Sequence, residues 1–132
     1  MKRNVRFGIL STAAIAKEVM IPAIRRASCA EVVAIASESG KANQAVQELG
    51  ILRAYDSYEQ LLDDPDVNAV YIPLPNSLHA EWTIQAAKKK KHVLCEKPAA
   101  LCEEDVRRMI EACEENGVLF MEAFMYQFHP QH

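Results

Sequence analysis

Short runs of hydrophobic residues alternate along the chain with segments whose hydrophobic residues recur every three or four positions. The short runs predict strands, and the run 31–37, which is apolar on both faces, is typical of a central strand of a parallel sheet. The recurring positions predict amphipathic helices. The expected strands are 5–10, 31–37, 53–55, 68–73, 92–95 and 118–123, and the expected helices are 13–27, 41–49, 76–90 and 103–116, with a short helix after Ser57. This alternation predicts an α/β fold, a Rossmann-type doubly wound parallel sheet of about six strands with helices on both faces.

Single residues sharpen several of these boundaries. Pro22 lies inside the segment 13–27 and predicts a kink or a break there. Gly50 predicts the end of one helix, and the Ser57 hydroxyl predicts the cap of the next. Asp64-Pro65-Asp66 predicts a turn. In the last helix, the residues expected to face the core are Val106, Met109, Ile110 and Cys113.

The first strand–helix turn holds small residues where dinucleotide-binding proteins carry their glycine fingerprint. Ser11, Ala13 and Ala16 fill the three glycine positions of G-x-G-x-x-G. Small side chains still let a pyrophosphate approach the backbone N–H groups, and Ser11 and Thr12 add hydroxyl donors. An ordinary tight turn built from small residues is the alternative, so this turn does not decide the function by itself.

The end of the second expected strand, Ser37-Glu38-Ser39, is where a Rossmann protein reads the ribose of its cofactor. Glu38 could accept a hydrogen bond from a ribose 2′-hydroxyl and would repel a 2′-phosphate. Ser37, Ser39 and Lys41 could instead surround that phosphate, and Glu38 could also be a solvated loop acid. Glu38 therefore mildly favours NAD as the expected cofactor, and NADP stays the alternative.

Glu96-Lys97-Pro98 follows the fifth expected strand directly. Ligands of open α/β sheets lie beyond the carboxyl ends of the strands. A lysine at that place can donate a proton or polarise an oxygen, and the glutamate can hold it in position. The alternative is an exposed ion pair in a loop, which would be worth little.

Composition narrows the class of protein. The 132 residues suit one domain with one core. The net charge of −3 favours neither nucleic acid nor an anionic membrane as a partner. No apolar run approaches the ~18–20 residues of a membrane helix. The lysine run 88–91 is expected to be the solvated end of a helix, with a phosphate-binding or nucleic-acid-binding patch as the alternative.

The four cysteines are Cys29, Cys95, Cys102 and Cys113, and their spacing is not that of a metal site. We expect them to be reduced packing residues of a cytoplasmic protein, with a redox or metal role as the alternative. The histidines also lack metal-ligand spacing. No metal site is therefore expected.

Longer segments of the chain resemble the glucose–fructose oxidoreductase / inositol dehydrogenase / MocA family of NAD(P)-dependent oxidoreductases. The most specific are Ala69-Val70-Tyr71-Ile72-Pro73-Leu74-Pro75-Asn76-Ser77-Leu78-His79 and Lys91-His92-Val93-Leu94-Cys95-Glu96-Lys97-Pro98. Shorter blocks lie at 7–13, 55–58, 64–67 and 121–126.

This resemblance implies roles for particular positions. Lys97 matches the active-site lysine, and Glu96 matches the acid expected to bind the cofactor ribose. The loop expected to lie against the cofactor comprises Pro73, Leu74, Pro75, Asn76 and His79, and the pyrophosphate turn comprises Ser11, Thr12, Ala13 and Ile15. His79 is equally a candidate for a cap or packing residue, and Trp82 is expected in the core rather than as a platform for adenine. Gln127 stands where relatives often have arginine.

The resemblance also implies the domain plan. Residues 1–123 are expected to be an NAD(P)-binding Rossmann domain, and residues 124–132 the start of a connection to a second domain that this chain does not contain. The expected function is hydride transfer between nicotinamide and a hydroxyl or carbonyl of a sugar, polyol or diol. The second domain would supply substrate contacts and any homo-oligomer interface, so the isolated chain is expected to be inactive. A non-catalytic NAD(P)-binding sensor, or a module that depends on a partner, is the alternative.

Overall fold

The computed structural model describes residues 5–13, 16–96 and 102–123. In these residues six strands form one sheet in the order β3-β2-β1-β4-β5-β6, and every neighbouring pair is parallel. The strands are β1 (Val5–Leu10), β2 (Ala30–Ala36), β3 (Arg53–Tyr55), β4 (Ala69–Ile72), β5 (His92–Glu96) and β6 (Phe120–Ala123). Each expected strand is present, with ends that shift by a residue or two. The predicted doubly wound parallel sheet is therefore confirmed.

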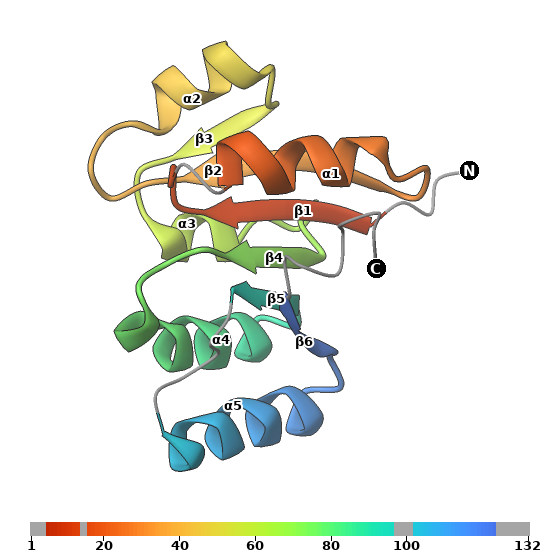
Figure 1. The fold of residues 1–132 in the computed structure, drawn as a ribbon, viewed down its shortest axis with the longest axis vertical. Helices are drawn as coiled ribbons and strands as arrows, with labels where there is room; N and C mark the ends of the chain where they lie inside the picture. Colours follow the sequence, from red (N-terminus) through yellow and green to blue (C-terminus); the bar gives the residue numbers. More distant parts are fainter. Residues whose placement is uncertain (1–4, 14–15, 97–101, 124–132) are drawn as a thin grey trace, which may run out of the picture.

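Helices cover both faces of the sheet. One face packs against α1 (Ile21–Arg26) and α2 (Ala42–Leu49), and the other packs against α3 (Tyr58–Leu62), α4 (His79–Lys88) and α5 (Glu103–Glu115). Successive strand residues alternate between the two cores, so Ile9 and Tyr71 lie in the first core while Leu10 and Val70 lie in the second. Figure 1 shows α1 and α4 both starting at the edge where β1 and β4 end.

The helix changes its type near Pro22, where the sequence predicts a kink or a break. A π-helix, η1 (Ala16–Met20), comes first, and α1 follows without interruption, with Pro22 in its first turn. Proline has no N–H to donate and its ring crowds the preceding turn, which accounts for the irregular turn before it. Gly50 has φ +67° and ends α2 as predicted, while the Ser57 Oγ accepts from the Gln60 N–H at 3.2 Å and caps α3. The helix expected at 76–90 begins with a 3₁₀ turn, η2 (Asn76–Leu78), before α4.

The prediction that Ile110 faces the core is wrong, because 40% of its surface is exposed. Met109 and Cys113 are buried as predicted, and Val106 is partly buried. The apolar stripe of α5 is narrow because this helix packs against α4 on one side and faces outward on the other (Figure 1). Ile110 lies on the outward side of that stripe.

All four cysteines are free, but only two of them pack in the core. Cys95 and Cys113 are buried, and burial raises the pKa of the Cys95 thiol to about 12. Cys29 and Cys102 are exposed, so the packing prediction is wrong for them. Cys29 precedes β2 and Cys102 precedes α5, where the chain runs over the surface.

The prediction of a solvated lysine run is wrong for Lys91, which is only 6% exposed. Its Nζ donates hydrogen bonds to the carbonyl oxygens of Asp64 at 2.9 Å and Val67 at 2.6 Å. Lys90 has φ +64°, and this left-handed turn redirects the chain after α4 so that Lys91 points inward. Burial lowers the pKa of Lys91.

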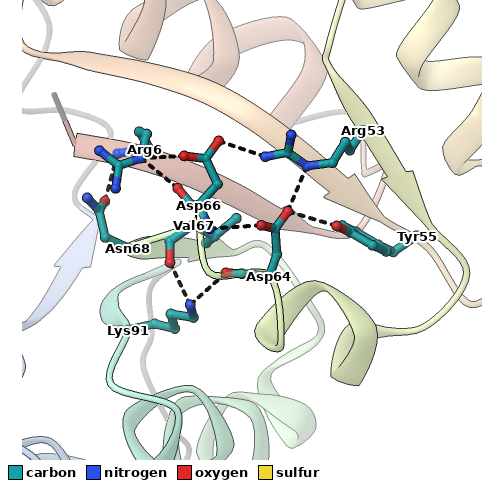
Figure 2. Close-up of polar contacts among 8 residues, drawn as sticks. All are labelled: Arg6, Arg53, Tyr55, Asp64, Asp66, Val67, Asn68 and Lys91. Atoms are coloured by element: carbon teal, nitrogen blue, oxygen red, sulfur yellow. Dashed lines mark hydrogen bonds and ion pairs between the residues drawn. The ribbon is translucent and has the colours of Figure 1, made fainter. Parts of the chain in front are cut away.

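A polar cluster surrounds Asp64 in the turn between α3 and β4 (Figure 2). One oxygen of Asp64, Oδ2, accepts from Arg53 Nε and from the Tyr55 hydroxyl, both at 2.8 Å, and Oδ1 accepts from the Asp66 N–H at 2.8 Å. Asp66 in turn forms ion pairs with Arg53 at 2.7 Å and with Arg6 at 2.9 Å. The turn predicted at Asp64-Pro65-Asp66 is therefore present, and it is tied to two strands.

This Asp64 cluster lies at the edge of the sheet where β1, β4 and β5 begin. Arg6 is the second residue of β1, Asn68 directly precedes β4, and Lys91 directly precedes β5. The Asn68 Oδ1 accepts from the Arg6 N–H at 2.7 Å, which joins the two strand starts. The opposite edge, where the strands end, contains the residues for which the sequence predicts a function.

Candidate functional site

The candidate site residues follow one another along the carboxyl edge of the sheet. They come from the ends of β2, β1, β4 and β5, which are neighbours in that order. The chain changes direction across the sheet between β1 and β4, since β1 is followed by β2 on one side and β4 lies on the other (Figure 1). Open α/β sheets bind their ligands at such a switch point. The order of the strands therefore brings four separate stretches of sequence to one place.

The turn after β1 has the backbone shape of a glycine turn although no glycine occupies it. Ser11 has φ +147°, in a region that glycine adopts readily and other residues rarely do. Its Oγ accepts from the Ala13 N–H at 3.1 Å, and Ser11, Thr12 and Ala13 are all partly exposed. Ser11 therefore adopts, without a glycine, the backbone conformation that a glycine would adopt readily at this position. Ile15 lies outside the described residues.

Gly8, three residues earlier, serves packing. A Cβ atom added at Gly8 would lie 2.5 Å from Leu61 Cδ2, and Leu61 is fully buried. The absence of a side chain at Gly8 lets α3 approach β1, just below the turn at Ser11.

The residues after β2 divide into one buried and several exposed groups. Ser37 is only 3% exposed, and its Oγ shares a 2.7 Å hydrogen bond with the Ser39 Oγ and accepts from the Ser39 N–H at 3.1 Å. Glu38, Ser39 and Lys41 are exposed. Burial, and then the charge of Glu38, raise the pKa of Tyr58. Ser37 thus supports the loop, and the exposed groups remain the ones able to meet a ribose.

His79 holds the loop after β4 through a hydrogen bond to the backbone of that loop. Pro73 and Leu74 are buried, and His79 is only 1% exposed. The His79 Nε2 lies 2.5 Å from the Leu74 carbonyl oxygen, which can only accept, so this nitrogen carries a proton. Of the two expectations for His79, the buried packing and capping role agrees with this geometry. Asn76 is the first residue of η2, at the end of the same loop.

At the end of β5, the Tyr71 hydroxyl donates a hydrogen bond to Glu96 Oε1. Tyr71 has no exposed surface, whereas Glu96 is partly exposed. Burial and the bond to the carboxylate raise the pKa of Tyr71 well above its usual range. Sequence reasoning missed Tyr71. The available signal was a lone phenol in a strand buried on both faces, because a buried tyrosine hydroxyl needs a partner. Lys97 lies outside the described residues.

Trp82 is in the core, as expected. It is 6% exposed and meets the Tyr58 ring edge to face, with centroids 5.1 Å apart.

Within the described ranges, no three His, Cys, Asp or Glu side chains form a group able to hold a metal ion. Among the same residues, no helix is long and apolar enough to cross a membrane.

The strand order and the row of polar groups at the switch point define a dinucleotide-binding domain of the Rossmann type. A family model described as an oxidoreductase family with an NAD-binding Rossmann fold, GFO_IDH_MocA, matches residues 5–124. The chain belongs to this family, as its sequence motifs predicted.

Curated relatives and solved structures agree with this assignment. The chain is 52% identical over 128 residues to the uncharacterized oxidoreductase ORF334 of Rhizobium meliloti, covering 96% of this chain and 38% of that protein. It is 51% identical over 125 residues to D-xylose 1-dehydrogenase (NADP⁺) 2 of Haloferax volcanii, covering 94% of this chain and 38% of that one. A crystal structure of KijD10, a 3-ketoreductase from Actinomadura kijaniata in complex with NADP, is 39% identical with a TM-score of 0.92, covering 98% of this chain and 42% of that one. The chain thus spans about two fifths of these relatives' length.

Proposed function

We propose that residues 1–123 form the cofactor-binding part of an NAD(P)-dependent oxidoreductase that transfers hydride between nicotinamide and a hydroxyl or carbonyl group of a sugar, polyol or diol. The observation that carries the proposal is the row of groups at the switch point, which runs from the loop after β2 through the Ser11 turn to the partly exposed Glu96. Support also comes from relatives named as a xylose dehydrogenase and a ketoreductase.

Each group in the row has a proposed task. The N–H groups and hydroxyls of the Ser11–Ala13 turn would bind the pyrophosphate. Glu96 would accept a hydrogen bond from a ribose hydroxyl, and the loop held by His79 would lie against the cofactor. A bound nicotinamide would supply the hydride chemistry. Lys97 would manage the proton on the substrate oxygen, the task for which a lysine beside a carboxylate is suited.

Residues 124–132 are proposed to begin the connection to a second domain that supplies substrate contacts and any homo-oligomer interface. Exposed apolar side chains on the last strand support this, since Met121 is 60% and Leu119, just before β6, is 67% exposed. Apolar surface of this kind is usually covered by a partner or another domain. The isolated chain would then bind a dinucleotide weakly and turn over no substrate.

For the cofactor itself we propose NADP ahead of NAD. The expectation of NAD rested on Glu38 and finds no support in two of the relatives, since one is named for NADP⁺ and the other was crystallised with NADP. A structure of WlbA from Bordetella pertussis, 32% identical, contains NADH. The exposed Ser39 hydroxyl and Lys41 would meet the 2′-phosphate.

Titration calorimetry of the 132-residue chain with NAD⁺, NADP⁺ and their reduced forms tests both parts. We expect measurable binding, and no binding of any form at millimolar concentration would refute the proposed function. Lys41→Ala should weaken NADP by about 3- to 10-fold and leave NAD unchanged, since only the phosphate loses a charge partner. Glu38→Arg should shift the ratio further toward NADP. An unchanged ratio in both variants would refute the proposed choice of cofactor.

Turnover needs the longer protein. In a form that includes the second domain, Lys97→Ala should lower kcat by roughly 10²- to 10⁴-fold, the usual scale for a proton-transfer group, with little change in dinucleotide affinity. An unchanged kcat would remove Lys97 from the mechanism. Binding without turnover in every such form would favour the sensor alternative.

A further inference from the structure

Tyr71 and Glu96 meet because of the register between two neighbouring strands. Tyr71 in β4 pairs with Leu94 in β5, and Glu96 lies two residues beyond Leu94. Residues two apart on a strand point to the same face, so Glu96 and Tyr71 share a face of the sheet. That face is the one covered by α1 and α2, whose core includes Tyr71. The hydroxyl of Tyr71 therefore reaches the sheet edge from inside the core.

The two partners of the Tyr71–Glu96 hydrogen bond differ in their exposure to solvent. Tyr71 has no exposed surface and its ring is fixed by the core around it, whereas Glu96 is partly exposed at the candidate site. A rigid donor therefore holds a carboxylate that would otherwise sample several rotamers. Oε1 accepts from Tyr71, and among the described residues no other side chain bonds to the Glu96 carboxylate. This bond uses only Oε1 of the partly exposed carboxylate.

We propose that Tyr71 is a positioning residue for the cofactor site: it holds Glu96 by Oε1 so that Oε2 accepts a hydrogen bond from a ribose hydroxyl of the dinucleotide. Tyr71 itself does not touch the ligand. The inference rests on the proposed function, and adds to it a residue that lies a strand away from Glu96 and inside the core. The competing explanation is that Glu96 merely satisfies a buried phenol, in which case the bond contributes to folding and not to binding.

A double-mutant cycle separates the two explanations. The variants are Tyr71→Phe, Glu96→Ala and the double variant, and the readout is the dissociation constant for NADP⁺ and for NAD⁺. Tyr71→Phe should weaken binding by about 3- to 10-fold when Glu96 is present, the usual scale of one hydrogen bond. It should have no further effect in the Glu96→Ala background, because the group it orients is gone.

Tyr55→Phe is the matched control. It also removes a tyrosine hydroxyl that donates to a buried carboxylate, that of Asp64, and should leave dinucleotide affinity unchanged. If Tyr71→Phe does not fold, the test is made by NMR on the wild-type chain. The NMR signal of the Tyr71 hydroxyl proton should then move when dinucleotide is added, while that of Tyr55 should not.

The outcomes distinguish failure of the proposed function from failure of the inference about Tyr71. A wild-type chain that binds no dinucleotide overturns the proposed function, and this inference with it. A wild-type chain that binds, together with equal losses from Tyr71→Phe in both backgrounds or with an unmoved Tyr71 hydroxyl signal, overturns the inference alone. A loss that requires Glu96 supports it.

Discussion

Replacing Asp64 with asparagine tests how much the Asp64 cluster stabilises the fold. Three donors point at this carboxylate, Arg53 Nε, the Tyr55 hydroxyl and the Asp66 N–H, each at 2.8 Å. Asparagine has the same shape but turns one acceptor oxygen into an NH₂ group. Whichever way the amide is oriented, the NH₂ faces a donor, and the attraction to the Arg53 cation is lost.

The cost follows from the geometry. A hydrogen bond to a charged group contributes about 1.5–3 kcal/mol, and a buried group left without its partner costs about 1–3 kcal/mol. The Arg53 side chain is 34% exposed, so water screens its share of the interaction. Asp64 itself is 6% exposed. We therefore expect Asp64→Asn to lower the free energy of unfolding by about 2–4 kcal/mol at pH 7.

The same contacts give this loss a pH dependence. Burial alone would raise the pKa of Asp64, but the bonds from the Asp66 N–H, Tyr55 and Arg53 outweigh it and the pKa is lowered. The folded pKa is thus below the unfolded value of about 3.9. The stabilisation by the wild-type carboxylate is full above that value and is lost as the pH falls through the folded pKa. The gap between the wild-type chain and Asp64→Asn should therefore narrow in acid.

Urea unfolding followed by circular dichroism, at pH 7 and at pH 3, measures both effects. Asp66→Asn is the control, since the Asp66 side chain is 44% exposed and its ion pairs should contribute less than about 1 kcal/mol. A difference below about 0.5 kcal/mol between wild type and Asp64→Asn at pH 7 would refute the reasoning, because that is the usual scatter of neutral surface changes. A gap that stays the same at pH 3 would refute the pH argument.

Three further substitutions follow from single contacts, each measured by the shift of the urea midpoint. Lys91→Met should cost about 2–4 kcal/mol, because the Asp64 and Val67 carbonyls lose their buried cationic donor, and a cost below about 1 kcal/mol would mean that desolvation of the ammonium cancels its bonds. Gly8→Ala should cost about 1–3 kcal/mol, since the new Cβ meets buried Leu61 at 2.5 Å, and an unchanged midpoint would show that Leu61 moves aside freely. Ser11→Gly should stabilise the chain by about 1 kcal/mol by relieving the φ of +147°, and a loss would mean that the Oγ bond to Ala13 outweighs the strain.

Local features of the sequence were enough to predict most of the fold. The strands predicted at 5–10 and 53–55 are β1 and β3 with those bounds, and Pro22, Gly50 and Ser57 mark a change of helix type, a helix end and a helix cap. Each of these features depends on residues a few positions apart. The fold class followed because alternating strands and helices admit few topologies.

Contacts between distant segments were the ones that sequence reasoning missed. Lys91 resembles its three lysine neighbours in the sequence, and only the loop at Asp64–Val67, packed above it, makes it a buried donor. Ile110 belongs to the same helical pattern of apolar positions as Met109 and Cys113, yet 40% of its surface is exposed, because it lies on the side of α5 that faces away from α4. The bond between Tyr71 and Glu96 depends on the register of β4 and β5, which no local pattern specifies. The roles of the candidate site residues stay predictions.

The polar contacts around Asp64 lie at the amino edge of the sheet, and the candidate site lies at the other edge. The residues that hold the strand starts together therefore differ from the residues proposed to select a ligand. The loops after β1, β2 and β4 can exchange side chains without disturbing the charged contacts that join β1, β3, β4 and the turn before β5. A scaffold organised in this way tolerates drift in its binding loops, so a new cofactor preference or a new substrate can arise by a few substitutions while the chain still folds. Directed evolution of this domain should accordingly randomise 11–13, 38–41 and 75–76, and leave the buried Pro73 and Leu74 and the segments 53–55 and 64–68 untouched.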